Sequence, residues 1–159
     1  GESRNIRVAA IVPPGAAERS YRLFIEELPP SEAERKPGVV QMLTRVGIPI
    51  FVAPHSAAVE AAELRDLSRE GQDLSFSLAN TGTMHFVPGA VSVKALAQDG
   101  RVLGERTVNA WYVLAGGLRT FTTDLPGLTA PDAAEVVVEA RVAGKTLIRR
   151  LDLATRVSR

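Results

Sequence analysis

The 159-residue sequence contains no cysteine, and this absence excludes several kinds of chemistry at once. A disulfide scaffold, a thiolate zinc site and a cysteine nucleophile all require the thiol group. Aromatic residues make up only 5% of the chain, and 19 Lys and Arg residues stand against 18 Asp and Glu residues. Because a nucleic-acid binder usually carries a basic stripe, this balance predicts no nucleic-acid partner.

Long hydrophobic runs are also missing. No apolar run approaches the roughly 20 residues that a helix needs to cross a bilayer, so we expect no direct membrane insertion. The N-terminal residues Gly1-Glu2-Ser3-Arg4 do not lead into the apolar stretch of a signal peptide. Hydrophobic residues still make up 45% of the chain, which is enough for the core of one ordinary domain or two small ones.

The inventory of catalytic residues is poor. The two histidines, His55 and His85, lie in separate parts of the chain, and neither has another ligand or an acid at metal-binding spacing. Gly144-Lys145-Thr146 looks like the end of a phosphate-binding loop, but Glu139 occupies the position of the first glycine, and a hairpin turn explains the tripeptide better. We therefore predict a protein that is not an enzyme and that has no catalytic residues, no cofactor and no metal.

The sequence does contain a repeated alternation of apolar and polar residues with period two, which is typical of β-strands. Asp99-Gly100 and Ala143-Gly144-Lys145 each separate two such runs and predict hairpins. The strand candidates include residues 6–12, 21–28, 39–52, 74–78, 91–96, 101–103, 136–142 and 147–153. We predict an all-β fold: an immunoglobulin-like antiparallel β-sandwich, preceded by an incomplete three-stranded part of a second immunoglobulin-like domain.

Residues 55–69 allow two interpretations. They contain good helix formers and could form a short helix, or they could be an interdomain linker that enters a strand. We place the domain boundary near Pro54 to Ala62, which divides the chain into residues 1–57 and 58–159. The downstream part has enough strand candidates for a complete sandwich, whereas three upstream strands cannot easily close two sheets around a core.

Residues 39–52 are the most informative stretch, because one face of this predicted strand is apolar along its whole length. Pro49 has no N–H group, so the strand belongs at a sheet edge or contains a bulge there. The strand could be a core strand of an ordinary sandwich, or it could pair with another chain through its backbone. The apolar face consists of Val40, Met42, Thr44, Val46, Ile48, Ile50 and Val52.

Two ordered motifs in this region resemble a known family. Residues 21–30 (YRLFIEELPP), a polar loop, and residues 43–54 (LTRVGIPIFVAP) resemble the periplasmic pilus-assembly chaperones of the chaperone–usher pathway. The endings of both motifs are similar to the archaic, spore-coat-U-associated branch. Residues 78–82 (LANTG) and 112–117 (YVLAGG) are similar to the C-terminal domain of that branch.

The resemblance implies two immunoglobulin-like domains that meet in an L-shape. Residues 6–11, 21–28 and 39–52 would be the last three strands of the first domain. The final strand would lend its alternating apolar residues to a pilin subunit that lacks its own final strand, which is donor-strand complementation. The residues that enter the subunit would be Val40, Met42, Thr44, Val46 and Ile48.

The sequence departs from the family in three respects. The first strands of the N-terminal domain are missing, so the chain is expected to be N-terminally truncated. A lysine that holds the subunit's terminal carboxylate has no counterpart, which leaves Arg45 and Arg22 as candidate carboxylate anchors. Arg7 and Glu18 match two members of an interdomain salt bridge, but the turn at residues 141–144 lacks the expected acid.

The function implied is that of a periplasmic chaperone that binds pilin or fimbrial subunits and delivers them to an outer-membrane usher. Strand exchange needs no nucleotide. Exposed strand edges also predict self-association. The alternative is an immunoglobulin-like structural or adhesion module, which predicts that the even-numbered face of residues 39–52 is buried in its own sandwich. A small hydrolase would need a catalytic cluster that neither histidine can be shown to join.

Overall fold

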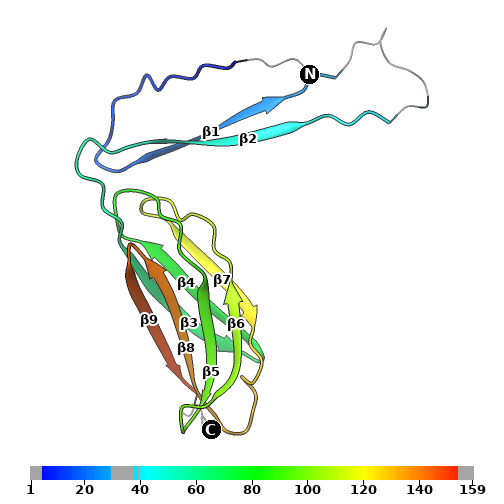
Figure 1. The fold of residues 1–159 in the computed structure, drawn as a ribbon, viewed down its shortest axis with the longest axis vertical. Helices are drawn as coiled ribbons and strands as arrows, with labels where there is room; N and C mark the ends of the chain where they lie inside the picture. The colour runs from blue at the N-terminus through cyan, green and yellow to red at the C-terminus, as the bar shows by residue number, and fades with distance from the viewer. Residues whose placement is uncertain (1–4, 30–37, 39, 154–159) are drawn as a thin grey trace.

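The computed structural model describes residues 5–29, 38 and 40–153. All regular secondary structure within these ranges is β-strand. The nine strands of this part of the chain form three antiparallel sheets (Figure 1). The predicted all-β, immunoglobulin-like class is confirmed. Over the described ranges, no helix is long and apolar enough to cross a membrane.

Seven strands form a sandwich at the C-terminal side. A three-stranded sheet has the order β3-β4-β7, and a four-stranded sheet has the order β6-β5-β8-β9. The strands are β3 (Ala62–Glu70), β4 (Asp73–Asn80), β5 (Val91–Ala97), β6 (Val102–Val108), β7 (Leu118–Asp124), β8 (Ala133–Val142) and β9 (Lys145–Asp152). Both predicted hairpins are confirmed, because β5 and β6 pair across residues 98–101 and β8 and β9 pair across residues 143–144.

The core of the sandwich lies between these two sheets and follows the period-two pattern of the sequence. Residues of β4 from one sheet meet residues of β5 and β8 from the other. Full burial of a Val, Leu or Phe side chain contributes about 1.5–3 kcal/mol, so these layers account for most of the stability of the sandwich. The residues with an exposed fraction of 1% or less include Leu74, Phe76, Leu78, Val91, Val93, Ala95, Val136, Val138 and Ala140.

The N-terminal part forms a separate two-stranded sheet, which we call the arm together with the preceding residues 5–12. Strand β1 (Arg19–Glu26) pairs with β2 (Arg45–Val52). Figure 1 shows the arm lying across one end of the sandwich, so that the two parts form an L. The predicted strand at residues 6–12 is wrong, because this segment pairs with no strand in the described chain and alternation alone does not supply hydrogen-bond partners.

Strand β2 is also shorter than the predicted strand over residues 39–52. It begins at Arg45, because its partner β1 ends at Glu26. One further backbone bond, from Glu27 N–H to Thr44 O at 2.9 Å, extends the ladder by a single pair. Residues 40–44 therefore lie beyond the paired strand, and position 39 lies outside the described residues.

The register of the arm fixes which face and which edge each residue of β2 uses. Thr44 O accepts a hydrogen bond from Glu27 N–H. Since backbone direction alternates along a strand, the even-numbered residues of β2 direct their N–H and C=O groups toward β1, and the odd-numbered residues direct theirs to the outer edge. Pro49 is odd-numbered, so its missing N–H leaves no gap in the β1–β2 ladder. The side chains of Pro49 and its partner Arg22 share the face that looks toward the sandwich, whereas Ile48 and Leu23 share the opposite face.

Residues 53–61 connect the arm to the sandwich, and we call this segment the connector. It contains no helix, and β3 begins at Ala62. The linker interpretation of residues 55–69 is therefore confirmed, and the helical interpretation is wrong. Two carbonyl groups of this part of the chain accept hydrogen bonds from the loop after β4. Thr83 N–H donates to Val59 O and Thr81 N–H donates to Ala61 O, both at 2.9 Å.

Candidate functional site

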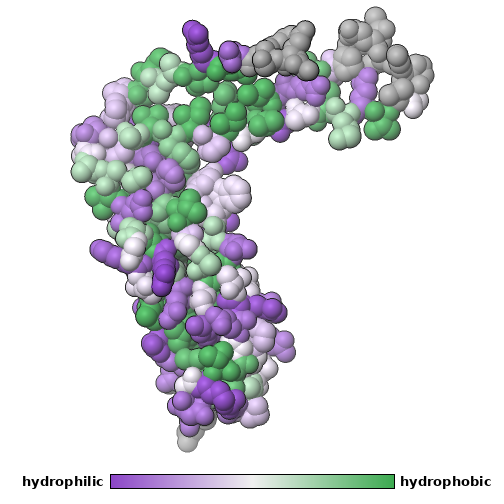
Figure 2. Space-filling model, viewed as in Figure 1, coloured by the Kyte–Doolittle hydropathy of each residue, from purple (hydrophilic) through white to green (hydrophobic). Residues whose placement is uncertain are grey.

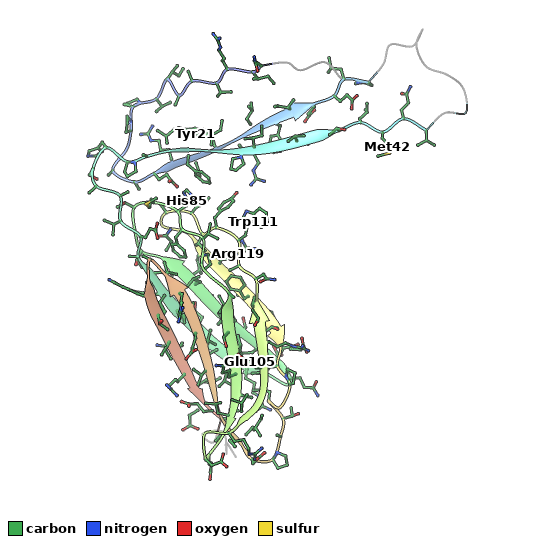
Figure 3. The ribbon with its side chains drawn as sticks, in the orientation of Figure 1. Tyr21, Met42, His85, Glu105, Trp111 and Arg119 are labelled. Carbon is green, nitrogen blue, oxygen red and sulfur yellow. The ribbon has the colours of Figure 1, made fainter. Side chains whose placement is uncertain are left out.

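The even-numbered residues Val40, Met42, Thr44, Val46 and Ile48, which we call the donor row, become more exposed with distance from the sandwich. The exposed fraction is 40% at Ile48, 47% at Val46, 89% at Met42 and 90% at Val40. Figure 3 shows Met42 near the end of the arm farthest from the junction. Apolar side chains this exposed in a row are characteristic of a surface that contacts another molecule.

The part of the apolar face nearer the junction is covered by the arm itself. Ile48 and Ile50 lie opposite Leu23 and Tyr21 in the β1–β2 register. Residues 8–12 border an apolar hollow of about 280 Å³ above Tyr21, Leu23 and Ile50. Figure 2 shows hydrophobic side chains gathered along this arm. The freely accessible part of the donor row is therefore its far half, from Val40 to Val46.

The structure places the two candidate carboxylate anchors in different environments. The Arg45 Nε lies 2.8 Å from Glu26 Oε1, and its guanidinium lies 4.2 Å from the centre of the Phe24 ring. Arg45 is thus already paired with a carboxylate. Arg22 has no such partner among the described residues, and its Nη2 donates to the Tyr112 hydroxyl at 2.7 Å.

A cleft of about 450 Å³ lies in the inner angle between the arm and the sandwich, and we call it the elbow cleft. Its lining residues are Arg22, Gly47, Pro49, Trp111, Tyr112 and Arg119. No carboxylate lines it, and within residues 5–29, 38 and 40–153 neither Arg22 nor Arg119 forms an ion pair. Trp111 is 67% exposed. The cleft therefore combines aromatic walls with two guanidinium groups that form no ion pair in the described part of the chain, although that of Arg119 lies 5.5 Å from the centre of the Phe121 ring.

Sequence reasoning missed Trp111 and Arg119. Figure 3 shows both on the end of the sandwich that faces the arm. Arg119 belongs to β7 and Arg22 to β1, which are far apart in the sequence. No local pattern indicates that they share a cleft, since their proximity depends on the angle between the arm and the sandwich.

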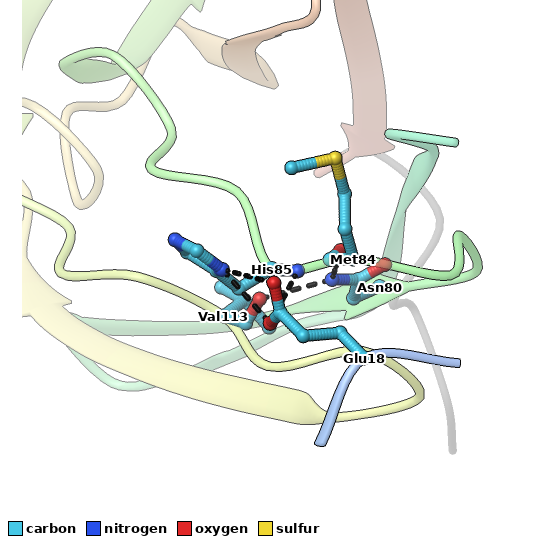
Figure 4. Close-up of polar contacts among 5 residues, drawn as sticks. All are labelled: Glu18, Asn80, Met84, His85 and Val113. Carbon is cyan, nitrogen blue, oxygen red and sulfur yellow. Dashed lines mark hydrogen bonds and ion pairs between the residues drawn. The ribbon is translucent and has the colours of Figure 1, made fainter. Parts of the chain in front are cut away.

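Glu18 lies at the junction between the arm and the sandwich, where it contacts His85 (Figure 4). Both Glu18 carboxylate oxygens lie 2.8 Å from His85 Nδ1, and Oε1 also accepts from the His85 backbone N–H at 3.1 Å. The Glu18 side chain is only 5% exposed. Arg7 lies in the segment before β1 and forms no ion pair with Glu18, so the structure does not bring these two predicted residues together.

Aromatic stacking reinforces the same junction. The rings of Phe51 and His85 stack with their centres 3.8 Å apart, and Tyr112 meets Phe51 edge-on at 5.5 Å. Phe51 comes from β2, whereas His85 and Tyr112 come from loops of the sandwich. The Glu18 contact, just before β1, and the Phe51 ring stack, on β2, together fix the arm to the sandwich.

Asn80 organises the loops that carry His85. Its side chain donates to Met84 O at 2.8 Å and to Val113 O at 2.9 Å, and its Oδ1 accepts from Gly82 N–H at 2.8 Å. The residue is 3% exposed, so these bonds replace nearly all of its contact with water. Asn80 therefore holds the loop after β4 in the shape that presents His85 to Glu18 (Figure 4).

The described residues show no arrangement suited to metal binding. No group of three or more His, Cys, Asp or Glu side chains in this part of the chain could hold a metal ion. Away from the elbow cleft, the Arg106 guanidinium, whose Nη2 lies 2.8 Å from Asp124 Oδ2, lowers the pKa of that carboxyl by hydrogen bonding and by charge.

Comparison with protein families adds independent information about the arm. Residues 1–58 match the family model described as pili and flagellar-assembly chaperone, PapD N-terminal domain. The similarity covers the arm and most of the connector. No curated protein matches the chain. The match covers 58 of the 159 residues.

Proposed function

We propose that this protein is a periplasmic chaperone that binds a pilin or fimbrial subunit by donating the row Val40, Met42, Thr44, Val46 and Ile48. In this proposal residues 1–57 belong to an N-terminal immunoglobulin-like domain and residues 58–159 form the C-terminal one. The subunit would later pass to an outer-membrane usher by strand exchange, which needs neither catalysis nor a nucleotide. We assign the chain to the archaic, spore-coat-U-associated branch on its two arm motifs.

The observation that carries the proposal is the exposure of the donor row along β2 and the residues just before it, where the outer edge of β2 pairs with no other strand of the described chain. Val40 and Met42 are each about nine-tenths exposed, and they lie just before β2, within the residues that match the chaperone family. A strand added at the outer edge of β2 gains backbone hydrogen bonds, and the alternate side chains gain apolar contacts. These are the two interactions that strand donation requires.

The same observation argues against the alternative of an immunoglobulin-like structural or adhesion module. That alternative predicts that the even-numbered residues are buried in the protein's own sandwich. Instead the core of the sandwich is built from β3 to β9 and their loops, and the donor row lies on the arm. The exposed edge is also the feature that favours self-association when no subunit is bound.

Within this proposal Arg22 is the better placed of the two candidate carboxylate anchors. Its guanidinium faces the elbow cleft without a carboxylate partner, whereas Arg45 is held by Glu26. Arg binds a carboxylate strongly when two parallel hydrogen bonds can form. We therefore assign the main contact with the subunit's terminal carboxylate to Arg22, with Arg45 available only when its pair with Glu26 opens.

The test is co-purification and calorimetric titration with a pilin subunit that lacks its own final strand. Met42→Asp and Val46→Asp place charge in the donor row and should abolish stoichiometric binding while the circular dichroism spectrum stays unchanged. Leu43→Asp is the matched control, because Leu43 is 52% exposed on the other face of the same segment. Equal binding by all three variants, or no binding by the folded wild-type chain, would refute strand donation.

A further inference from the structure

We propose that the adjacent residues Glu26 and Glu27 form a clasp that positions residues 40–44, which we call the donor segment, for strand donation. This inference rests on the proposed function and deepens it, because it names the residues that hold the accessible half of the donor row in place. Glu26 acts through Arg45, and Glu27 acts through the backbone of Thr44. Neither glutamate contacts the bound chain, so both are positioning residues.

The first contact of the clasp lies where the β1–β2 ladder ends. Strand β1 ends at Glu26, and Glu27 N–H then donates to Thr44 O at 2.9 Å. In a complete antiparallel pair the return bond would run from Thr44 N–H to the carbonyl of Glu27. Thr44 N–H donates instead to the side-chain Oε2 of Glu27 at 3.2 Å. A carboxylate oxygen therefore replaces the backbone acceptor at the point where β1 turns away.

The second contact holds the first residue of β2. The Arg45 Nε lies 2.8 Å from Glu26 Oε1, and the same guanidinium lies 4.2 Å from the centre of the Phe24 ring. Gly47 makes room for this ring, because a Cβ at Gly47 would lie only 3.2 Å from Phe24 Cε1. An exposed ion pair alone holds a strand weakly, but here a cation–π contact acts on the same side chain.

The clasp also selects one alignment of β2 against β1. Arg45 lies opposite Glu26, and Gly47 lies opposite Phe24. A slip of one residue would turn the whole donor row to the other face of the arm. A slip of two residues would separate Arg45 from Glu26 and would place Arg45 or Pro49, each with a Cβ, opposite the Phe24 ring. Only the observed alignment keeps both contacts.

The exposure of the donor row changes at the clasp. The exposed fraction rises from 47% at Val46, inside β2, to 89% at Met42, beyond the clasp. Residues 40–43 form no backbone hydrogen bond within the described ranges, and Figure 1 shows the chain before β2 extending past the end of β1. A segment that is fixed at its base and open along its edges loses less conformational freedom when an incoming strand pairs with it.

The first test needs no partner and measures hydrogen exchange of the Thr44 amide by NMR in the full chain. Glu27→Ala should accelerate this exchange about tenfold or more, because the amide loses a charged acceptor. Glu27→Gln keeps an acceptor oxygen and should restore most of the protection. Glu60→Ala, at an exposed position of the connector, is the control and should leave the rate unchanged. An unchanged rate in a folded Glu27→Ala variant would overturn the proposal.

The second test measures the association kinetics of a pilin subunit that lacks its own final strand. Glu26→Arg and Arg45→Glu should each slow association several-fold and leave dissociation unchanged, because fewer free molecules hold the donor segment ready. The double variant with both substitutions should associate nearly as fast as the wild type, since the pair is restored with its charges exchanged. Arg150→Glu breaks an exposed pair with Glu135 on the sandwich and is the control matched in charge to Arg45→Glu.

Two outcomes of the kinetic test would contradict the clasp. One is association of both single variants at the wild-type rate. The other is a double variant as slow as the single ones, which is the result expected if Arg45 itself contacts the subunit.

The outcome is separable from that of strand donation. If the subunit binds and depends on Met42, yet associates equally fast with the Glu26→Arg and Arg45→Glu variants, the clasp inference fails and the proposed function stands. If Met42→Asp does not affect subunit binding, the proposed function fails, whatever the exchange rate of the Thr44 amide shows.

Discussion

Glu18 and His85, which lie 67 positions apart in the sequence, meet with a carboxylate oxygen 2.8 Å from the imidazole Nδ1. Glu18 precedes β1 and His85 follows β4, so this contact joins the arm to the sandwich. Because the carboxylate is almost fully buried, its hydrogen bonds to His85 must replace those to water. The pair therefore fixes the position of the arm more firmly than an exposed ion pair would.

We predict that Glu18→Gln loosens the arm. Hydrogen bonds to a charged group contribute about 1.5–3 kcal/mol, and the neutral amide loses most of this. Limited proteolysis should cleave the connector several-fold faster in the variant. Glu63→Gln is the control, because Glu63 forms an exposed pair with Arg65. Equal cleavage of the two variants would show that Glu18 does not hold the arm.

Gly82 is predicted to be irreplaceable for the attachment of the connector. A Cβ at this position would lie 2.2 Å from Val59 O and 2.7 Å from Ala61 N, and both atoms belong to the connector backbone. Gly82→Ala should therefore break the bonds from the Thr81 and Thr83 amides, and their hydrogen exchange should accelerate by about tenfold or more. Gly89→Ala should leave both rates unchanged, because its Cβ would meet no atom closer than 3.8 Å.

Asn80→Ala should destabilise the chain more than any surface substitution. It removes three hydrogen bonds and leaves the buried carbonyl of Val113 and the partly buried carbonyl of Met84 with fewer partners. Each buried group that loses its partner costs about 1–3 kcal/mol. Urea unfolding should show a loss in this range or above it, whereas the exposed Asn109→Ala should change little. A loss below that of Asn109→Ala would contradict the assigned role.

The Arg106–Asp124 pair gives a prediction about pH. The Arg106 guanidinium lowers the pKa of Asp124. The stabilising contribution of this pair is therefore present at neutral pH and is lost as the pH falls through the lowered pKa of Asp124. In Arg106→Gln the NMR titration midpoint of Asp124 should rise toward 3.8. Arg101→Gln, which removes a pair with Asp132, should not move it. The effect on unfolding should be small because the Asp124 side chain is 64% exposed.

The hairpins of the sandwich could be predicted because their signals are local. Asp99-Gly100 provides the turn, and Gly100 adopts a φ of 83° that glycine accommodates without strain. Gly144, with a φ of 74°, has the same function between β8 and β9. Alternating residues on each side then assign the buried face of each strand. Sequence neighbours are enough for such elements.

The arm shows where sequence reasoning fails. Residues 6–12 alternate as strands do, yet they have no backbone partner in the described chain, and a strand requires one. The length of β2 was overestimated for the same reason, since β1 ends at Glu26. Likewise, nothing near Arg119 in the sequence indicates that Arg22 shares its cleft. These features depend on contacts between distant segments, which alternation and propensity do not encode.

Pro49 interrupts the outer edge of β2 at one point, since Arg45, Gly47 and Phe51 present an N–H there and Pro49 does not. An incoming strand that slides by two residues must place a different carbonyl opposite the proline ring, so the ring distinguishes one alignment from its neighbours. A second copy of the same edge would bring its own interruption and lose a bond on each side. The same missing hydrogen that marks the alignment of a true partner therefore also penalises open-ended stacking of free chains into fibres.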